Sequence, residues 1–187
     1  AGISVDTYRA NTARSALKRG ATMVNDITAL RGDPEMAEVV AEAGCDCVLM
    51  HMLGTPQTMQ QKPRYQDVVG DICAFFEERL ETAARAGIER GHLWLDPGFG
   101  FGKNPAHNLE MLRRLREFKQ FGLPVLIGTS NKSTIGKVLD VPVEERTEGT
   151  AATVALAIAN GADVVRVHDV KAMARVARMS DAVVQGS

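Results

Sequence analysis

Short apolar runs alternate with longer stretches of helical periodicity along the chain, and this alternation limits the fold more than any other feature. Strands separated by helices form parallel sheets, because each helix returns the chain to the same edge. The unit repeats six times, which predicts an α/β fold. The predicted strands are 3–5, 22–24, 47–50, 93–95, 124–127 and 164–167. The predicted helices are 8–19, 34–43, 66–86, 106–120, 144–160 and 170–184.

Local signals support some of the helix boundaries. Asp33 before Pro34 predicts an N-cap followed by proline at the first helical position. Gly44 and Gly87 stand where helix ends favour a residue that tolerates positive φ.

The charge balance and the short apolar runs exclude several functions. Lys and Arg number 22 against 23 Asp and Glu, so the net charge of −1 provides no positive field for nucleic acid. The apolar runs are far shorter than the roughly 18 residues that a membrane span needs. No secretory signal or linker is visible, so we expect one domain over residues 1–187, in the cytoplasm, without nucleic acid or membrane as partner.

The cysteines raise the question of a metal site. Cys45 and Cys47 lie two residues apart, with His51 close by. Zinc sites usually show a second pair of ligands, and cysteine is among the most buried residue types. The count of three is odd, and a chain of this length folds without disulfides. Buried thiols are therefore the favoured interpretation.

Polar side chains follow every predicted strand. Because parallel strands end at the same edge of a sheet, these residues are expected to converge on one site, where barrels and doubly wound sheets bind ligands. For Asp26 or Asp169 alone, capping of the next helix is the favoured interpretation. Arg166 lies inside an apolar run, where a charge is costly unless it is paired or liganded. The residues after the strands are Asp6, Asn25, Asp26, His51, Asp96, Ser130, Lys132, His168 and Asp169.

Three strand-end segments suggest the chemistry of the ligand. Residues 95–103 carry three alternate glycines, which would allow a close approach to a flat ligand, but they lack the spacing of a phosphate-binding P-loop. Residues 128–133 combine hydroxyls and an ammonium before a helix, although a serine-rich turn capping that helix is the plain alternative. Arg166 and His168, two apart on a strand end, suit a phosphate or pyrophosphate. Ser130 has no evident base and orienting partner, which argues against nucleophilic catalysis.

The number of strands leaves two folds open. A (β/α)₈ barrel takes about 250 residues, so six units on that scale come to about the length of this chain. The chain is either a complete open doubly wound sheet or a barrel without two of its βα units. Length alone does not separate them.

Seven stretches resemble one family when taken in order. They are SVDT (4–7), VNDI (24–27), LMHM with Gly54 (49–52), LDPGFGFGK (95–103), SNKSTIG (130–136), ERTEGT (145–150) and RVHDV (166–170). With them the chain closely resembles the dihydropteroate synthase family over essentially its whole length. That family is a (β/α)₈ TIM barrel whose pattern makes the first strand here the third, so the resemblance favours a barrel lacking its first two βα units.

The resemblance implies a reaction. The family joins 6-hydroxymethyl-7,8-dihydropterin pyrophosphate to p-aminobenzoate, giving 7,8-dihydropteroate and pyrophosphate for folate synthesis. The pyrophosphate leaves first, and the arylamine then captures a pterin-stabilised methylene cation. The resemblance also implies Mg²⁺ as cofactor, a homodimer, and a family that is the target of sulfonamide mimics of p-aminobenzoate.

The resemblance assigns roles to individual residues. The implied pterin-binding residues are Asp6, Asn25, Met50, Asp96 and Lys132. Those for p-aminobenzoate are Phe101, Lys132 and Ser133, and those for pyrophosphate are Arg166 and His168. The implied catalytic residues are Asp6, Lys132, Arg166 and His168.

Two departures from the family pattern and two alternatives remain. The Asn that binds Mg²⁺ in the family belongs to the barrel units that this chain lacks, so no metal ligand is assigned here. Asn131 stands where many members have Arg, which removes one positive charge near the anionic substrates. The alternatives are a corrinoid-dependent pterin-binding methyltransferase domain and a pterin-binding fragment without catalytic activity.

Overall fold

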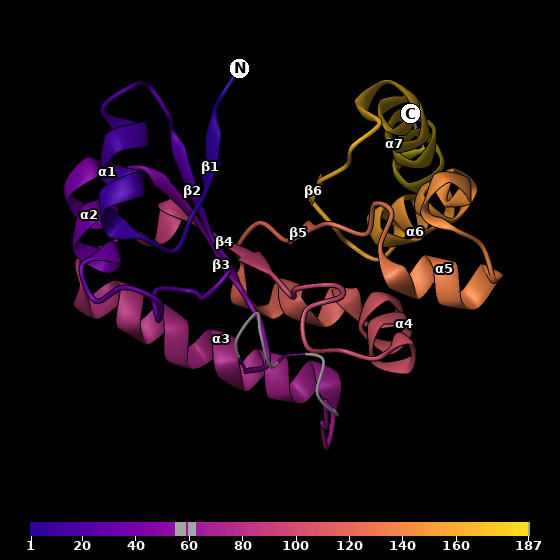
Figure 1. Ribbon diagram of the computed structural model, residues 1–187, viewed down its shortest axis with the longest axis horizontal. Helices are drawn as coiled ribbons and strands as arrows, with labels where there is room; N and C mark the ends of the chain where they lie inside the picture. Colours follow the sequence, from indigo (N-terminus) through magenta and orange to yellow (C-terminus); the bar gives the residue numbers. More distant parts are fainter. Residues whose placement is uncertain (55–58, 60–62, 187) are drawn as a thin grey trace.

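The strands of the computed structural model, which describes residues 1–54, 59 and 63–186, form one sequential parallel array (Figure 1). They are β1 (Ser4–Asp6), β2 (Met23–Asp26), β3 (Asp46–Met50), β4 (Leu93–Asp96), β5 (Leu126–Ile127) and β6 (Val164–Val165). The first four pair in chain order, β5 pairs with β6, and a parallel bridge between Leu95 and Val125 connects the two groups. All six predicted strands are therefore confirmed.

The strand order separates the two folds that the length left open. A doubly wound sheet reverses its strand order at a switch point, whereas a barrel adds each strand beside the one before it. The order here is strictly sequential, with β1 and β6 at the two ends of the array (Figure 1). The arrangement is that of a barrel wall.

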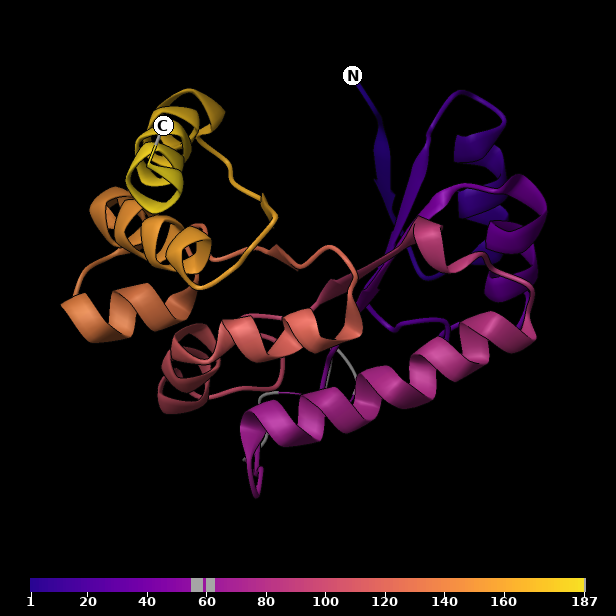
Figure 2. The ribbon, with the colours of Figure 1, turned by 180° about the vertical axis from the view of Figure 1, so that it is seen from behind.

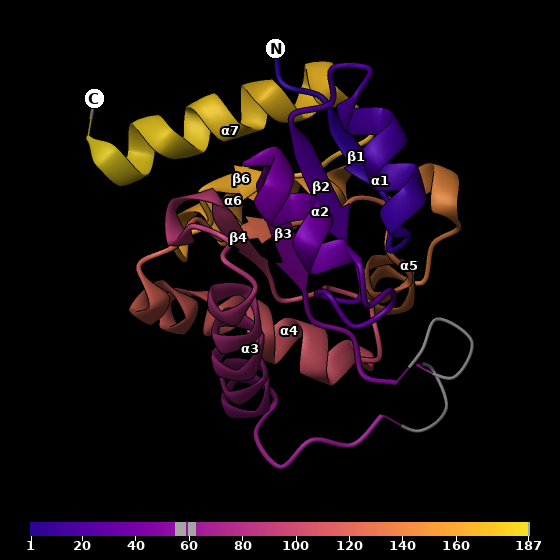
Figure 3. The same ribbon diagram turned by 90° about the vertical axis from the view of Figure 1, so that its left-hand side faces the viewer.

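Helices connect successive strands. They are α1 (Ala10–Leu17), α2 (Met36–Ala43), α3 (Val68–Arg85), α4 (Pro105–Arg113), α5 (Ser133–Leu139), α6 (Thr147–Ala159) and α7 (Val170–Gln185). Three short 3₁₀ helices occupy Arg90–His92, Leu115–Phe121 and Val143–Glu145. α1 and α2 lie side by side over the outer face of the first strands (Figure 3), and α3 and α4 cover the strands that follow (Figure 2). Each helix of the described chain is too short or too polar to cross a membrane.

Some helix boundaries differ from those predicted. The predicted helix 106–120 is divided at Arg114 into α4 and a 3₁₀ helix, and α5 is a short helix outside the predicted ranges. α2 begins at Met36, two residues after the predicted start. The N-cap of α2 is Glu35 rather than Asp33. Asp33 still accepts the N–H of Glu35 at Oδ1, as a residue before Pro34 was expected to do, and its Oδ2 accepts the N–H of Ala10. Gly44 and Gly87 have φ of +55° and +81°, which confirms both predicted helix ends.

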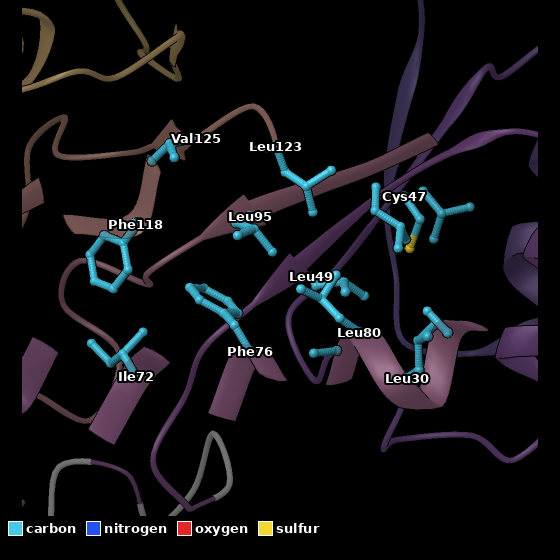
Figure 4. Close-up of a cluster of buried hydrophobic side chains, with 14 of the residues drawn as sticks. Leu30, Cys47, Leu49, Ile72, Phe76, Leu80, Leu95, Phe118, Leu123 and Val125 are labelled. Carbon is cyan, nitrogen blue, oxygen red and sulfur yellow. The ribbon is translucent and has the colours of Figure 1, made fainter. Parts of the chain in front are cut away.

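Side chains alternate between the two faces of the strands. Cys47, Leu49 and Leu95 point outward into the hydrophobic core, in which Phe76 lies close to Leu49 and Leu95 (Figure 4). The intervening residues point to the inner face, where a cavity of about 290 Å³ lies below the strand ends. Its lining includes Met23, Asn25, Val48, Trp94, Leu126 and Arg166.

The thiols behave as predicted. Cys45 and Cys47 are free and buried, and burial raises the pKa of both. The ring of His51 pairs instead with Lys103. Within the described residues, no cluster of three or more His, Cys, Asp or Glu side chains is suited to a metal ion. The predicted burial of the two thiols is confirmed.

Candidate functional site

The acidic and amide side chains of the site come from the ends of β1, β2 and β4. Asp6 lies beside Asn25 in the register of the β1–β2 pair, and Met50 lies beside Asp96 in that of β3 and β4. The parallel register places these residues at one edge of the sheet, on its inner face. The expected convergence of the strand ends is therefore found.

Asn25 has one amide atom satisfied and one unsatisfied. Its Nδ2 donates to Asp6 Oδ1 at 2.6 Å, but its Oδ1 is buried and has no hydrogen-bond partner in the described chain. A buried acceptor without a donor is costly, and native proteins nearly always satisfy one. The unsatisfied Oδ1 is therefore available to accept a hydrogen bond from a ligand.

Asp96 is a carboxylate held inside the protein. It is 2% exposed, and its Oδ1 accepts a hydrogen bond of 2.8 Å from the N–H of Gly98. Burial raises the pKa of Asp96, while the Gly98 hydrogen bond and the charges of Arg166 and Lys103 act in the opposite direction. Such a carboxylate is arranged to accept hydrogen bonds from a donor-rich ligand edge.

Cationic side chains gather opposite these acceptors. Lys132, Arg166 and His168 line one pocket of about 330 Å³ together with Asp6. Arg166 Nη1 lies 3.5 Å from Asp6 Oδ2, an ion pair that joins β6 to β1 although these strands do not pair. Burial and the neighbouring Arg166 both lower the pKa of Lys132. The pocket therefore offers concentrated positive charge to an anion.

An aromatic wall lies beside the cations. Lys132 Nζ lies 4.3 Å from the centroid of the Phe101 ring, which is a cation–π contact. Phe101 lines a second pocket, of about 300 Å³, that shares Asp6 and Arg166 with the cationic pocket. The two pockets are thus neighbours with common walls.

Two further predicted residues lie outside these pockets. Met50 is fully buried at the end of β3, beside Asp96 in the sheet register. Ser133 is exposed as the first residue of α5, directly after Lys132. Neither lines the two pockets, so their binding roles stay predictions.

Of the two strand-end aspartates that were expected to cap the next helix, Asp169 does so, whereas Asp26 binds N–H groups of the turn after β2 and caps no helix. Asp26 accepts hydrogen bonds from the N–H groups of Thr28 and Leu30, at 2.7 and 2.8 Å. Asp169 is the N-cap of α7 and accepts from the N–H of Ala172. Both carboxylates thus accept hydrogen bonds from backbone N–H groups that follow them closely in the chain.

The glycines after β4 have a different role from the one expected. Gly98 has φ of +72°, and a Cβ there would lie 1.9 Å from the carbonyl oxygen of His51. A Cβ on Gly102 would lie 2.7 Å from the side chain of Leu53. The close approaches at these two glycines are to the protein's own chain rather than to a flat ligand.

Sequence reasoning missed a buried cation below this loop. Lys103 is 3% exposed, and its Nζ lies 2.9 Å from His51 Nδ1 and donates to the carbonyls of Gly98 and Phe101 at 3.1 Å. Burial lowers the pKa of Lys103 to about 7. The sequence signal that could have indicated this pair is Lys103 directly after three alternate glycines. A glycine-rich loop leaves room for its backbone carbonyls to accept hydrogen bonds from one donor.

The loop after β5 also differs from expectation. Ser130 was expected to lack a basic partner, but its Oγ lies 2.8 Å from His168 Nδ1. Asn131 has φ of +56°, a left-handed conformation that asparagine tolerates better than most residues. The Asn131 carbonyl accepts a 2.8 Å hydrogen bond from Arg146 Nη1, which holds the loop beside Lys132.

Fold and site together define an α/β protein of the (β/α) barrel type, with a polar ligand site at the carboxyl ends of its strands. The sequence pattern of the family described as pterin binding enzyme matches residues 1–168. The chain therefore belongs to the pterin binding enzyme family, within which the similar proteins described next are dihydropteroate synthases.

Three relatives illustrate the similarity. The dihydropteroate synthase of Synechocystis sp. (strain PCC 6803) is 48% identical over 181 residues, covering 96% of this chain and 63% of that protein. That of Yersinia pestis, solved with a sulfonamide drug complex, is 41% identical with a TM-score of 0.96, covering 100% of this chain and 68% of that one. That of Xanthomonas albilineans, solved with 7,8-dihydropteroate, is 39% identical with a TM-score of 0.90, covering 97% of this chain and 66% of that one.

The comparisons confirm the predicted family and the predicted barrel fold. The chain spans a little under two thirds of the length of the Synechocystis relative. Its six strands correspond to a part of the TIM barrel of these relatives.

Proposed function

We propose that the protein catalyses the dihydropteroate synthase reaction, transferring the (7,8-dihydropterin-6-yl)methyl group from pyrophosphate to the amine of p-aminobenzoate, which loses a proton as the new C–N bond forms. The observation that carries the proposal is the unsatisfied Oδ1 of Asn25 and the buried carboxylate of Asp96 at the same edge of the sheet as the pocket lined by Lys132, Arg166 and His168. Its support from relatives is the 7,8-dihydropteroate held by the Xanthomonas albilineans enzyme.

The pterin edge is complementary to the acceptors of the site. Its 2-amino and N3 groups are donors, which Asp96 and the open Oδ1 of Asn25 accept. Asp6 orients Asn25 through the 2.6 Å hydrogen bond. In this proposal Lys132 donates to the pterin carbonyl side, and Met50 provides apolar contact beside Asp96.

Two cations, Lys132 and Arg166, and the imidazole of His168 stabilise the leaving group. Bond breaking moves negative charge onto pyrophosphate, and preorganised cations are most effective where charge develops. Arg166, His168 and Lys132 line the pocket that would hold this anion. The carboxylate of Asp6 lies beside them and stabilises the positive charge that develops on the pterin methylene. No protein nucleophile is needed.

The p-aminobenzoate ring is proposed to pack on Phe101. Phe101 and Lys132 already contact each other, so an aromatic carboxylate entering there meets an aromatic wall and a cation. Ser133 would contribute from the start of α5. Because the Yersinia pestis enzyme is solved with a sulfonamide drug complex, we propose that sulfonamides compete for this position.

Mg²⁺ remains a proposal that this chain's own residues do not yet support. The described residues hold no cluster of three or more His, Cys, Asp or Glu side chains suited to a metal. The residues of this chain to which the proposal assigns stabilisation of the leaving group are Arg166, His168 and Lys132. The homodimer and the cytoplasmic location likewise stay predictions.

A product assay tests the proposal. The chain is incubated with 6-hydroxymethyl-7,8-dihydropterin pyrophosphate, p-aminobenzoate and Mg²⁺, and 7,8-dihydropteroate and pyrophosphate are expected in equal amounts. Arg113→Ala, an exposed change on α4, is the control for Arg166→Ala. Pterin binding without product would favour the non-catalytic alternative. Methyl transfer from a methylated folate to a corrinoid would favour the methyltransferase, which has no pyrophosphate for the three cationic residues to bind.

A further inference from the structure

One hydroxyl group joins the loops that follow β5 and β6. Ser130 Oγ lies 2.8 Å from Nδ1 of His168 and also accepts the backbone N–H of His168 at 3.3 Å. Ser130 is 6% exposed, whereas His168 is exposed and lines the cationic pocket. The histidine is therefore held at two points by a buried residue from the neighbouring strand end.

The number of donors and acceptors at Ser130 determines which atom donates in the hydrogen bond between Ser130 Oγ and His168 Nδ1. A serine hydroxyl has one proton to donate, and its oxygen accepts through its lone pairs. The backbone N–H of His168 is a donor only, so it occupies a lone pair of Ser130 Oγ. Within residues 1–54, 59 and 63–186, Nδ1 of His168 is the acceptor found for the hydroxyl proton. If Nδ1 carried a hydrogen, the buried hydroxyl would be left without an acceptor, which is unfavourable.

We propose that Ser130 is a positioning residue that holds neutral His168 in the Nε2–H tautomer, so that the ring presents an N–H donor to an anion in the cationic pocket. The opposite tautomer would turn a nitrogen lone pair toward the anion, which is repulsive. In neutral imidazole, the hydrogen bond at one nitrogen sets the proton on the other.

The identity of the anion rests on the proposed function, whereas the tautomer does not. Lys132 and Arg166 line the same pocket as the ring and supply positive charge. A directed N–H donor beside them adds geometric selection for an oxyanion such as pyrophosphate. In the described chain, Nε2 of His168 makes no hydrogen bond and is left to the ligand.

NMR of the ligand-free full chain tests the tautomer directly. The chain is labelled with ¹⁵N-histidine, and long-range ¹H–¹⁵N correlations are recorded at about pH 8.5, where an ordinary imidazole is neutral. His168→Gln identifies the His168 signals among the four histidines. We expect a single Nε2–H tautomer in the wild type and in Ser130→Thr, which keeps a hydroxyl, and a mixture in Ser130→Ala. An Nδ1–H tautomer or a mixture in the wild type would overturn the proposal without any variant having to fold.

Pyrophosphate binding tests the consequence. Isothermal titration with inorganic pyrophosphate is expected to show weakening of about 3- to 10-fold in Ser130→Ala, the range for one net hydrogen bond, and less than about twofold in Ser130→Thr. Equal affinity of Ser130→Ala and the wild type would reject the positioning role. If the wild type bound no pyrophosphate, the leaving-group site of the proposed function would fail, while the NMR result would still decide the tautomer.

Discussion

Lys103 and His51 form a buried pair in which the lysine Nζ lies 2.9 Å from the histidine Nδ1. His51 directly follows β3, and the carbonyls of Gly98 and Phe101 in the loop after β4 accept hydrogen bonds from the same Nζ. Burial, and second the charge of Lys103, lower the pKa of His51, so the imidazole is neutral and accepts. The pair thus connects two strand ends and holds the loop that carries Phe101.

The free energy of unfolding should depend on pH through the titration of Lys103. Burial lowers the pKa of Lys103 from its ordinary value of 10.5 to about 7, so between these values the unfolded chain binds a proton that the folded chain does not. Stability therefore rises with pH across this window, by up to about 1 kcal/mol per pH unit. Urea unfolding of the wild type and Lys103→Met at pH 7, 8 and 9 measures the difference in slope.

Lys103→Met keeps the length of the side chain and removes the titrating group, so its stability curve should be flatter over this window. Lys137→Met, an exposed change on α5, is the matched control and should keep the wild-type slope. Parallel curves for the wild type and Lys103→Met would show that Lys103 stays protonated in the folded chain.

The backbone at Gly98 should not tolerate a side chain. A Cβ there would lie 1.9 Å from the His51 carbonyl oxygen, and φ of +72° is unfavourable for alanine. Gly98→Ala is expected to destabilise the chain by at least about 3 kcal/mol in thermal or urea unfolding. Gly91→Ala, where nothing lies within 4 Å of the new Cβ, should change stability by less than about 0.5 kcal/mol. Similar losses for both would contradict the steric argument.

The carboxylate of Asp96 should matter for pterin affinity. Asp96→Asn replaces one acceptor oxygen by a donor and is expected to weaken binding of free 6-hydroxymethylpterin by about 1.5–3 kcal/mol, the range for hydrogen bonds to charged groups. Isothermal titration measures the change. Asp140→Asn makes the same substitution at an exposed position after α5 and should leave affinity unaltered. Unaltered affinity in Asp96→Asn would remove this residue from the pterin site.

Replacement of Arg166 should weaken binding of the pterin pyrophosphate much more than binding of free pterin. Its guanidinium lines the cationic pocket, so Arg166→Ala is expected to weaken binding of the pterin pyrophosphate about tenfold or more, while free pterin binds nearly as before. Competition binding with the two ligands measures the ratio. Loss of the ion pair with the largely exposed Asp6 contributes little, because exposed pairs are weak. Equal losses for both ligands would contradict the pyrophosphate role.

Local patterns were sufficient for much of the fold. Strand periodicity and the glycines at helix ends depend on near neighbours in the chain, and all six strands together with Gly44 and Gly87 were predicted from them. The N-cap of α2 is Glu35 rather than Asp33, and the N–H that Ala10, distant in sequence, donates to Asp33 could not be predicted from local patterns. The glycines after β4 were assigned to a ligand because nothing local reveals that His51 and Leu53 lie against them.

The amino-acid sequence alone was enough to establish the αβ alternation, the family, and which charged residue types end each strand, because these follow from chain periodicity and residue identity. Only the tertiary structure shows that Asn25 Oδ1 is an unsatisfied acceptor and that hydrogen-bond contacts join Lys103 to His51 and Ser130 to His168. Those partners lie 52 and 38 residues apart. A hydrogen bond needs atoms within about 3 Å, and that proximity is created only when packing brings distant strand ends together.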